Sequence, residues 1–269
     1  MRDETIVRRG VVLRHRLLER NRKVLKEANE KGVLPTLEDS KCLPSYERPR
    51  REMHQKGYLR PKRHGGVRNV ARNSRKNERG FTIFNGREVQ HESGLEHDVS
   101  LMLQADRTVA ELYSQKTVAK YQDDEGVWRK TIFDYLVVKT DGSHIGIAVK
   151  PERYRQRILK IFEQIAMSSE ETQIDAAIFM SNAQATRARV ANARSILWAR
   201  IEANPTEVEG LQHFLKGRKS IEFWELYHYR AVGNWARKAA IWRLIDLGVL
   251  EPASEYERID DLTYLTVNL

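Results

Sequence analysis

Two runs of strand-forming residues joined by a turn constrain the fold of this chain more than any other feature. Residues 131–138 (TIFDYLVV) and 145–150 (IGIAVK) are rich in β-branched and aromatic residues, which favour strands. Between them lies Thr-Asp-Gly-Ser at 140–143, which has the residue types of a tight turn. The sequence therefore predicts an antiparallel hairpin near the middle of the chain.

The length of this turn decides which side chains share a face of the hairpin. A three-residue loop centred on Gly142 would place Asp134 directly opposite Lys150, with Cβ atoms about 4.5–5.5 Å apart. A two-residue loop at Asp141-Gly142 would shift the register by one residue and separate the two side chains. A charged pair at this site therefore requires a loop of odd length.

A helix is predicted before the hairpin, over residues 93–104 (SGLEHDVSLMLQ). Its apolar residues recur at helical spacing and are Leu95, Val99, Met102 and Leu103. Ser93 is followed three residues later by Glu96, which is the pattern of a capping box. Glu96 therefore has a structural explanation as well as a chemical one.

Glu96, Asp134 and Lys150 together have the chemistry of a metal-dependent phosphodiester hydrolase. Mg²⁺ is typically held by one or two carboxylates, waters and substrate phosphate. The ion polarises the phosphoryl oxygen and activates water, while a nearby lysine stabilises developing charge. The simpler alternatives are a helix cap for Glu96 and a solvated strand end for Lys150. Asp134 is harder to explain that way, because an unpaired carboxylate in an apolar strand is costly.

The motifs around these residues resemble those of the TnsA-type transposon endonucleases, which have a restriction-endonuclease-like core of the PD-(D/E)xK type. The resemblance is close over residues 70–152 and only general beyond 205. The segments that carry it are SGLEHD (93–98), FDYLV (133–137) and AVKP (148–151), with Val109 and Gln115 between the first two.

The resemblance implies a role for each of five residues. Glu96 and Asp134 would be ligands of Mg²⁺, which Mn²⁺ can replace, and Lys150 would be the catalytic lysine. The backbone carbonyl of Val149 would be a further metal ligand. Gln115 would contact the active site, with a surface glutamine as the alternative.

Two positions depart from the family's motifs. Phe133 stands where the family has proline, a change that we expect to be harmless. Ala148 stands where the family has Glu or Gln two residues before the lysine. This alanine removes a candidate ligand, so that the number of metal ions and a degenerate, inactive core both stay open.

Basic residues are concentrated in the N-terminal third of the chain. Residues 1–90 contain 24 Lys and Arg against 11 Asp and Glu, whereas the whole chain has a formal net charge of +10. Such a segment indicates a polyanion partner, most often nucleic acid, and the alternative is a solvated tail. The candidate DNA-binding residues are Arg60, Lys62, Arg63, Arg68, Arg72, Arg75, Lys76 and Arg79.

The predicted fold class is α/β, with a restriction-endonuclease-like mixed sheet flanked by helices. The predicted domains are a basic N-terminal arm (1–78), the endonuclease core (79–204) and a winged-helix-like C-terminal domain (205–269). Within them we expect a helical segment at 5–31, an extended basic loop at 36–80, a hairpin at 79–91, strands at 109–121, a helix from Pro151, a buried strand at 174–180 and a long helix at 182–203.

The C-terminal region predicts three helices followed by two strands. Its third helix, over 233–247, carries Arg237, Lys238 and Arg243, and such a helix enters the major groove in DNA-binding winged helices. The loop between the strands is acidic, however, so a protein partner is the alternative.

Other features narrow the class of protein. Cys42 is the only cysteine, which excludes an intrachain disulfide and a cysteine-based zinc site. We find neither a run of about 18 apolar residues nor the apolar core of a signal peptide. We expect no membrane association and a cytoplasmic protein, which by resemblance is bacterial and associated with the nucleoid when bound to DNA.

The expected function is an Mg²⁺-dependent DNA endonuclease of a transposition system. By resemblance it cleaves the 5′ ends of the transposon together with a separate transposase and an AAA+-type regulatory ATPase. One alternative is a stand-alone restriction or repair nuclease. The other is a catalytically decayed DNA-binding scaffold, with Ala148 as the sign of decay.

Overall fold

The computed structural model describes residues 61–67, 79–168, 174–229 and 235–269. The helical segment predicted at 5–31 lies outside these ranges, as does most of the basic loop predicted at 36–80. The described residues form two compact units, which join between Leu197 and Trp198, inside a helix.

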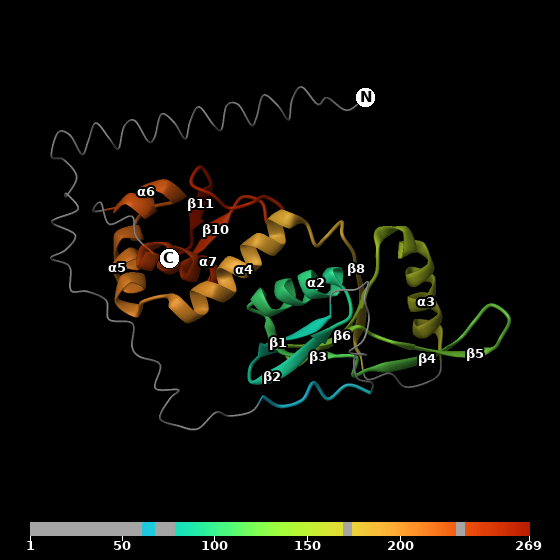
Figure 1. Cartoon of the computed structure of the whole chain (residues 1–269). Coiled ribbons are helices and arrows are strands. Elements are labelled where there is room, and N and C mark those ends of the chain that lie inside the picture. Colours follow the sequence, from blue (N-terminus) through green and yellow to red (C-terminus); the bar gives the residue numbers. More distant parts are fainter. Residues whose placement is uncertain (1–60, 68–78, 169–173, 230–234) are drawn as a thin grey trace, which may run out of the picture. The chain divides into compact units, whose positions relative to one another are not determined.

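The larger unit is built on a four-stranded mixed sheet with the order β3-β6-β7-β8 (Figure 1). Its strands are β3 (Val109–Ser114), β6 (Tyr135–Lys139), β7 (His144–Val149) and β8 (Ala176–Met180). Strand β6 is antiparallel to both β3 and β7, and β8 runs parallel to β7. Its helices are α2 (Gly94–Ala105), the short 3₁₀ helix η3 (Glu152–Tyr154), α3 (Arg155–Met167) and α4 (Arg187–Glu202), which ends in the other unit. The predicted mixed sheet flanked by helices is confirmed.

A tight hairpin precedes α2, within the range 79–91 predicted for it, and its turn is the dipeptide Asn85-Gly86. Its strands are β1 (Gly80–Phe84) and β2 (Arg87–His91). Asn85 and Gly86 have φ values of 48° and 73°. Two positive φ angles are what the type I′ hairpin turn requires.

A second two-stranded ribbon lies between β3 and β6 in the chain and corrects one prediction. It consists of β4 (Val118–Gln122) and β5 (Trp128–Ile132). Residues 131–132 therefore pair with β4, whereas β6 pairs with β3. The single strand predicted over 131–138 is wrong, because the chain changes partner at Phe133-Asp134.

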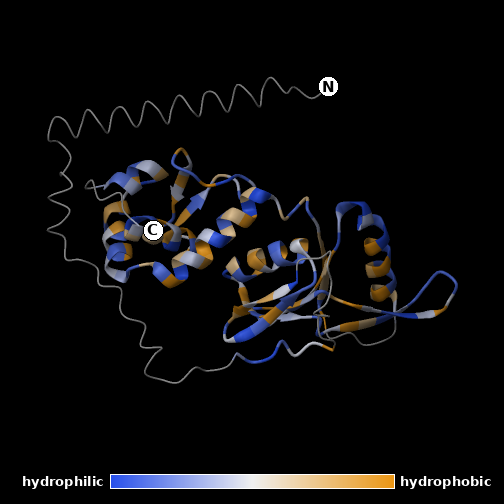
Figure 2. Ribbon diagram, viewed as in Figure 1, coloured by the Kyte–Doolittle hydropathy of each residue, from blue (hydrophilic) through white to orange (hydrophobic). Residues whose placement is uncertain are grey.

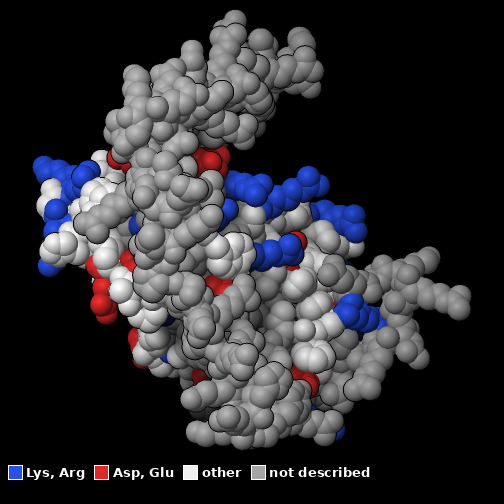
Figure 3. Space-filling model, turned by 60° about the vertical axis from the view of Figure 1, so that its left-hand side comes forward, with Lys and Arg blue, Asp and Glu red and all other residues white. Residues whose placement is uncertain are grey.

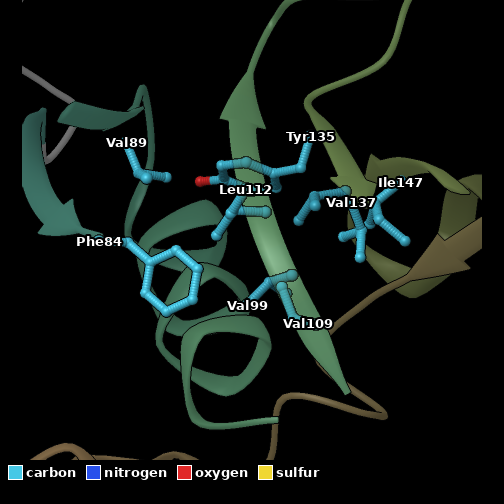
Figure 4. Close-up of a cluster of buried hydrophobic side chains, with 9 residues drawn as sticks. Phe84, Val89, Val99, Val109, Leu112, Tyr135, Val137 and Ile147 are labelled. Atoms are coloured by element: carbon cyan, nitrogen blue, oxygen red, sulfur yellow. The ribbon is translucent and has the colours of Figure 1, made fainter. Parts of the chain in front are cut away.

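Apolar clusters cover both faces of the sheet. One cluster joins α2 and the first hairpin to the sheet, and Figure 4 shows Val99, Leu112, Tyr135 and Val137 within it. The other cluster contains Phe133 and Ile165 and lies beneath α3, whose hydrophobic residues follow one side of the helix (Figure 2). Strand β8 was predicted as buried, but its Ile178 is 44% exposed. The reason is that β8 is an edge strand, with only β7 beside it.

The smaller unit packs three helices against a three-stranded antiparallel sheet of order β10-β11-β9. The elements are α5 (Pro205–Leu215), β9 (Ser220–Glu222), α6 (Phe223–His228), α7 (Trp235–Asp246), β10 (Leu250–Pro252) and β11 (Tyr264–Val267). The three helices and two later strands match the predicted order. Strand β9 was not predicted, since three residues are too few to show a period.

One of the three basic residues predicted on the third helix, Arg237 of α7, is buried. Arg237 is only 4% exposed, and its guanidinium donates to the carbonyls of Leu226 (3.0 Å) and Tyr229 (2.6 Å). It also forms an ion pair with Glu207. Of the two alternatives for this helix, a DNA contact is therefore not available to Arg237, because its side chain is buried and bonded inside the unit.

Candidate active site

The structure brings Asp134 and Lys150 into contact. Asp134 lies in the short link between β5 and β6, and its side chain is 13% exposed. Lys150 Nζ donates to Asp134 Oδ2 at 3.1 Å and to Oδ1 at 3.3 Å. The Val149 N–H donates to Asp134 Oδ2 at 2.7 Å. The carboxylate is thus held by the strand that returns from the hairpin.

The hairpin loop has the predicted odd length but a different centre. Val138 pairs with His144 and Lys139 N–H donates to the Ser143 carbonyl, so the loop comprises residues 140–142. The position that faces Asp134 is then Ala148, and Lys150 lies on the diagonal. The observed register differs from the predicted one by two residues, so Lys150 remains on the same face of the hairpin as Asp134. A long side chain such as lysine can still reach a diagonal neighbour.

Turn chemistry explains this register. Asp141 Oδ1 accepts hydrogen bonds from Ser143 N–H (2.9 Å) and Ser143 Oγ (2.7 Å). Gly142 follows with φ of 87°. Three-residue hairpin loops commonly place a left-handed residue last, a conformation that glycine adopts at no steric cost. Gly142 therefore ends the loop, and the predicted centre at Gly142 is wrong by one residue.

Glu96 is buried at the first turn of α2, as the capping pattern predicts. Its N–H donates to Ser93 Oγ at 3.2 Å, and its Oε2 accepts from the Glu92 N–H at 2.7 Å. A standard capping box returns to the N-cap residue itself, whereas here the carboxylate caps the residue before it. Ser93 is confirmed as the N-cap, whereas the Glu96 carboxylate bonds one residue earlier than a capping box predicts. This bond engages only part of a carboxylate that has two acceptor oxygens.

Glu96 lies within electrostatic range of Asp134 and Lys150. Burial raises the pKa of Glu96, the charge of Asp134 raises it further, and Lys150 lowers it. Burial also raises the pKa of Asp134, against the opposing effects of Lys150 and the Val149 N–H. A cation is stabilising beside buried carboxyls whose charged form is disfavoured by burial and by a neighbouring carboxylate.

Glu92 is a fourth charged residue at this site and was not among the predicted site residues. Its charge raises the pKa of both Glu96 and Asp134. Its position in the sequence could have indicated this, because Glu92 lies one residue after β2 and directly before the N-cap Ser93. Among the described residues, no group of three or more His, Cys, Asp or Glu side chains is arranged to hold a metal ion. The acids therefore form a loose group, not a preformed cage.

Gln115 lies beside Asp134 in a strained backbone conformation. Its N–H donates to the Asp134 carbonyl at 3.0 Å, and its φ is 49°. A non-glycine residue in the left-handed region costs of order 1–3 kcal/mol and is often found at functional sites. Gln115 is only 4% exposed, so the alternative of a surface glutamine is wrong.

One described part of the basic segment, residues 61–67, lies between the first hairpin and Gln115. Lys62 pairs with the first hairpin, where its N–H donates to the Gly86 carbonyl at 2.8 Å. Five residues later, the Val67 N–H donates to the Gln115 carbonyl at 2.9 Å. Gly66 permits this approach, because a Cβ there would lie 2.5 Å from the Ser114 carbonyl oxygen.

Three of the eight predicted DNA-binding residues lie in the described ranges, namely Lys62, Arg63 and Arg79. Lys62 and Arg63 are exposed and Arg79 is half-buried. The other five lie outside the described residues and are Arg60, Arg68, Arg72, Arg75 and Lys76. On the face shown in Figure 3, basic side chains form several groups with acidic ones between them. The described residues therefore form no single continuous basic patch on this face.

Ala148 places no donor atom at the position that faces Asp134. Its half-buried methyl group packs against the cluster that contains Phe133. The chain therefore offers no third carboxylate from β7.

Comparisons with known proteins give no family for this chain: no family model matches it, and no curated protein matches it. In the described ranges, no helix has the length and apolarity needed to cross a membrane.

Proposed function

We propose that this protein is an Mg²⁺-dependent DNA endonuclease. The observation that carries the proposal is the convergence of Glu96, Asp134 and Lys150, which come from a helix, an interstrand link and the end of a strand. When bound between the two carboxylates, Mg²⁺ would supply a Lewis acid and a more acidic water.

The backbone of β7 supports Val149 as a further ligand. The Val149 N–H faces Asp134, whereas the next residue, Lys150, donates its N–H to Met180 on the opposite side. In a strand, the N–H and carbonyl of one residue face the same neighbour. The Val149 carbonyl is therefore directed toward the side of β7 on which Asp134 lies.

Lys150 would act on the substrate by charge. Its side chain is 44% exposed, so the ammonium reaches solvent while it contacts Asp134. A phosphate that enters the site would meet this ammonium, which stabilises the negative charge that develops on the phosphate during hydrolysis. Asp134 keeps the ammonium in place.

We propose further that the enzyme belongs to a transposition system and cuts the 5′ ends of the element beside a separate transposase. This step rests on the resemblance of the motifs around Glu96, Asp134 and Lys150 to the TnsA-type endonucleases. The smaller unit, with three helices and a three-stranded sheet, is compatible with a winged helix. We propose that it binds an AAA+-type regulatory ATPase, because Arg237 is not available for DNA.

The test is cleavage of a duplex that carries a transposon end, with Mg²⁺, by the protein alone and with the transposase and ATPase. The proposal expects a cut at the 5′ end of one strand, which Asp134→Ala abolishes. Cutting of any duplex without the partners would instead favour a stand-alone nuclease.

A decayed scaffold is the second candidate, favoured by Ala148. That candidate expects DNA binding with no Mg²⁺-dependent cut under either condition. The Ala148→Glu variant separates the two, because a gain of cleavage from an inactive protein would show that the missing carboxylate was the defect.

A further inference from the structure

The β4–β5 ribbon is a direct extension of the candidate active site. Beyond the bond between Gln115 and Asp134, the Phe133 N–H donates to the Thr117 carbonyl at 3.1 Å. Val118 then pairs with Ile132, and the ladder continues to Gln122 and Trp128. The base of the ribbon is therefore the pair of chain segments that carries Asp134.

The two faces of the ribbon differ. On one face, Ala119 is buried and Tyr121 packs against the cluster beneath α3. The other face, which we call the outer face, has Trp128 at 50% exposure and Val118 at 39%. By the strand register the outer face consists of Val118, Lys120, Gln122, Trp128, Lys130 and Ile132.

Two lysines stand directly opposite each other on the outer face. Lys120 pairs with Lys130 in the register, and both are exposed. Like charges directly opposite in an antiparallel pair are destabilising, and the outer face contains no acidic residue. The charged side chains of the outer face are therefore both positive.

The acidic tip of the ribbon is occupied by contacts of its own. Asp123 forms an ion pair with Arg129 at 2.9 Å. Asp124 forms an ion pair with Lys160 of α3 and accepts a hydrogen bond from Gln164 at 2.8 Å. These contacts hold the tip against α3, and none of them involves a residue of the outer face.

We propose that the outer face binds the phosphate backbone of duplex DNA beside the cut, an inference that rests on the proposed nuclease function. A two-stranded ribbon fits the major groove, which is about 12 Å wide. The lysine pair matches phosphate charge, and Trp128 offers an apolar contact next to it. Both are features of nucleic-acid surfaces.

The register also places the contact along the DNA. Lys130 is four residues from Asp134, which corresponds to at most about 13 Å at roughly 3.3 Å per residue. At about 3.4 Å of helix axis per nucleotide, the lysine pair contacts DNA within roughly four base pairs of the scissile phosphate.

Binding of a labelled duplex, measured by fluorescence anisotropy over a range of salt concentrations, tests the proposal. The Lys120→Ala/Lys130→Ala variant is expected to bind more weakly and to lower the slope of log K against log salt by about 2. Trp128→Ala is expected to weaken binding with little change in slope. Arg107→Ala is the control, since this exposed residue precedes β3 at the opposite end of that strand from Gln115.

Footprinting on the same duplex gives the position, and the lysine variant should lose protection within about four base pairs of the cut. An unchanged affinity and salt slope in the lysine variant, with normal circular dichroism, would overturn the proposal.

The results distinguish failure of the ribbon proposal from failure of the nuclease proposal. If only Asp134→Ala affects the protein, by abolishing cleavage, the ribbon proposal falls and the nuclease stands. If the lysine variant loses binding but the unmodified protein never cleaves, the ribbon proposal stands and the nuclease falls.

Discussion

Tyr135 and Glu96 are 39 residues apart in the sequence and are joined by a buried hydrogen bond, in which the Tyr135 hydroxyl donates to the Glu96 carbonyl at 2.9 Å. Burial raises the pKa of Tyr135 well above its usual value, so the phenol remains a donor. The bond fixes the first turn of α2 to the residue that follows Asp134. Figure 4 shows the hydroxyl of Tyr135 directed toward the side where Val89 of β2 lies.

Tyr135→Phe removes this bond and keeps the ring. We expect a loss of about 1 kcal/mol in the free energy of unfolding and about a tenfold weaker affinity for Mg²⁺, because Tyr135 positions a proposed ligand. Thermal unfolding and a titration of cleavage rate against Mg²⁺ measure the two effects. Tyr154→Phe is the matched control, because Tyr154 is 37% exposed. A lower rate at saturating Mg²⁺ with unchanged affinity would contradict the positioning role.

The raised pKa values of Glu96 and Asp134 make a prediction about stability and pH. Their folded pKa values lie above the unfolded values. The protonated carboxyls therefore contribute to the free energy of unfolding below the unfolded pKa, and this contribution is lost as the pH rises through the folded pKa. We expect Glu96→Gln to be more stable than the unmodified protein at pH 7.5 without metal. The gap in stability should narrow as the pH falls through the raised folded pKa of Glu96 and should be closed below about 4.3, the usual pKa of a glutamate.

Metal should reverse that ranking. A cation that binds only the folded state adds about 2.7 kcal/mol at 100 times its dissociation constant. The unmodified protein should gain more from Mg²⁺ than Glu96→Gln does in the same thermal melt. Glu163→Gln, an exposed change on α3, should follow the unmodified protein throughout. Equal gains for all three proteins would remove Glu96 from the metal site.

Gly146 allows Phe133 to lie against β7. A Cβ at this position would lie 2.8 Å from the Phe133 ring. We expect Gly146→Ala to cost about 1–3 kcal/mol by overpacking and to reduce cleavage, because Phe133 adjoins Asp134. Gly210→Ala is the control, since a Cβ there meets nothing within 4 Å. That helical change should stabilise by about 0.5–1 kcal/mol. Cleavage by Gly146→Ala at the unmodified rate would show that Asp134 does not depend on this packing.

Arg237 should be a stability residue of the smaller unit. Arg237→Ala leaves the Leu226 and Tyr229 carbonyls and Glu207 without their buried partner. We expect a loss of about 3 kcal/mol or more, read from chemical denaturation. Lys238→Ala, the exposed neighbour, should change stability by less than about 0.5 kcal/mol. A loss of stability in Arg237→Ala as small as that in Lys238→Ala would contradict the buried role of Arg237.

The sequence was most informative where the signal is local. Ser93 and the apolar spacing placed α2, and Asn85-Gly86 placed the first hairpin, because caps and turns are decided by a few adjacent residues. The contact between Asp134 and Lys150 also followed from local chemistry, although the loop centre was wrong. An odd loop length alone is enough to keep both residues on one face.

The remaining features depend on tertiary contacts. Residues 131–138 read as one strand, and nothing in their composition shows that Phe133-Asp134 marks a change of partner strand. Glu92 has no motif of its own and joins the site only because β2 ends beside α2. Arg237 looks like any basic helix residue until Glu207, from a different helix, lies against it. Patterns along the chain do not report such distances.

The most direct test of the account is Mg²⁺-dependent cleavage by the unmodified protein and by Asp134→Ala, with circular dichroism to establish that both are folded. The account predicts that Asp134→Ala lowers the cleavage rate at least about 100-fold, which corresponds to roughly 2.7 kcal/mol of transition-state stabilisation. Cleavage by Asp134→Ala at the unmodified rate would contradict it.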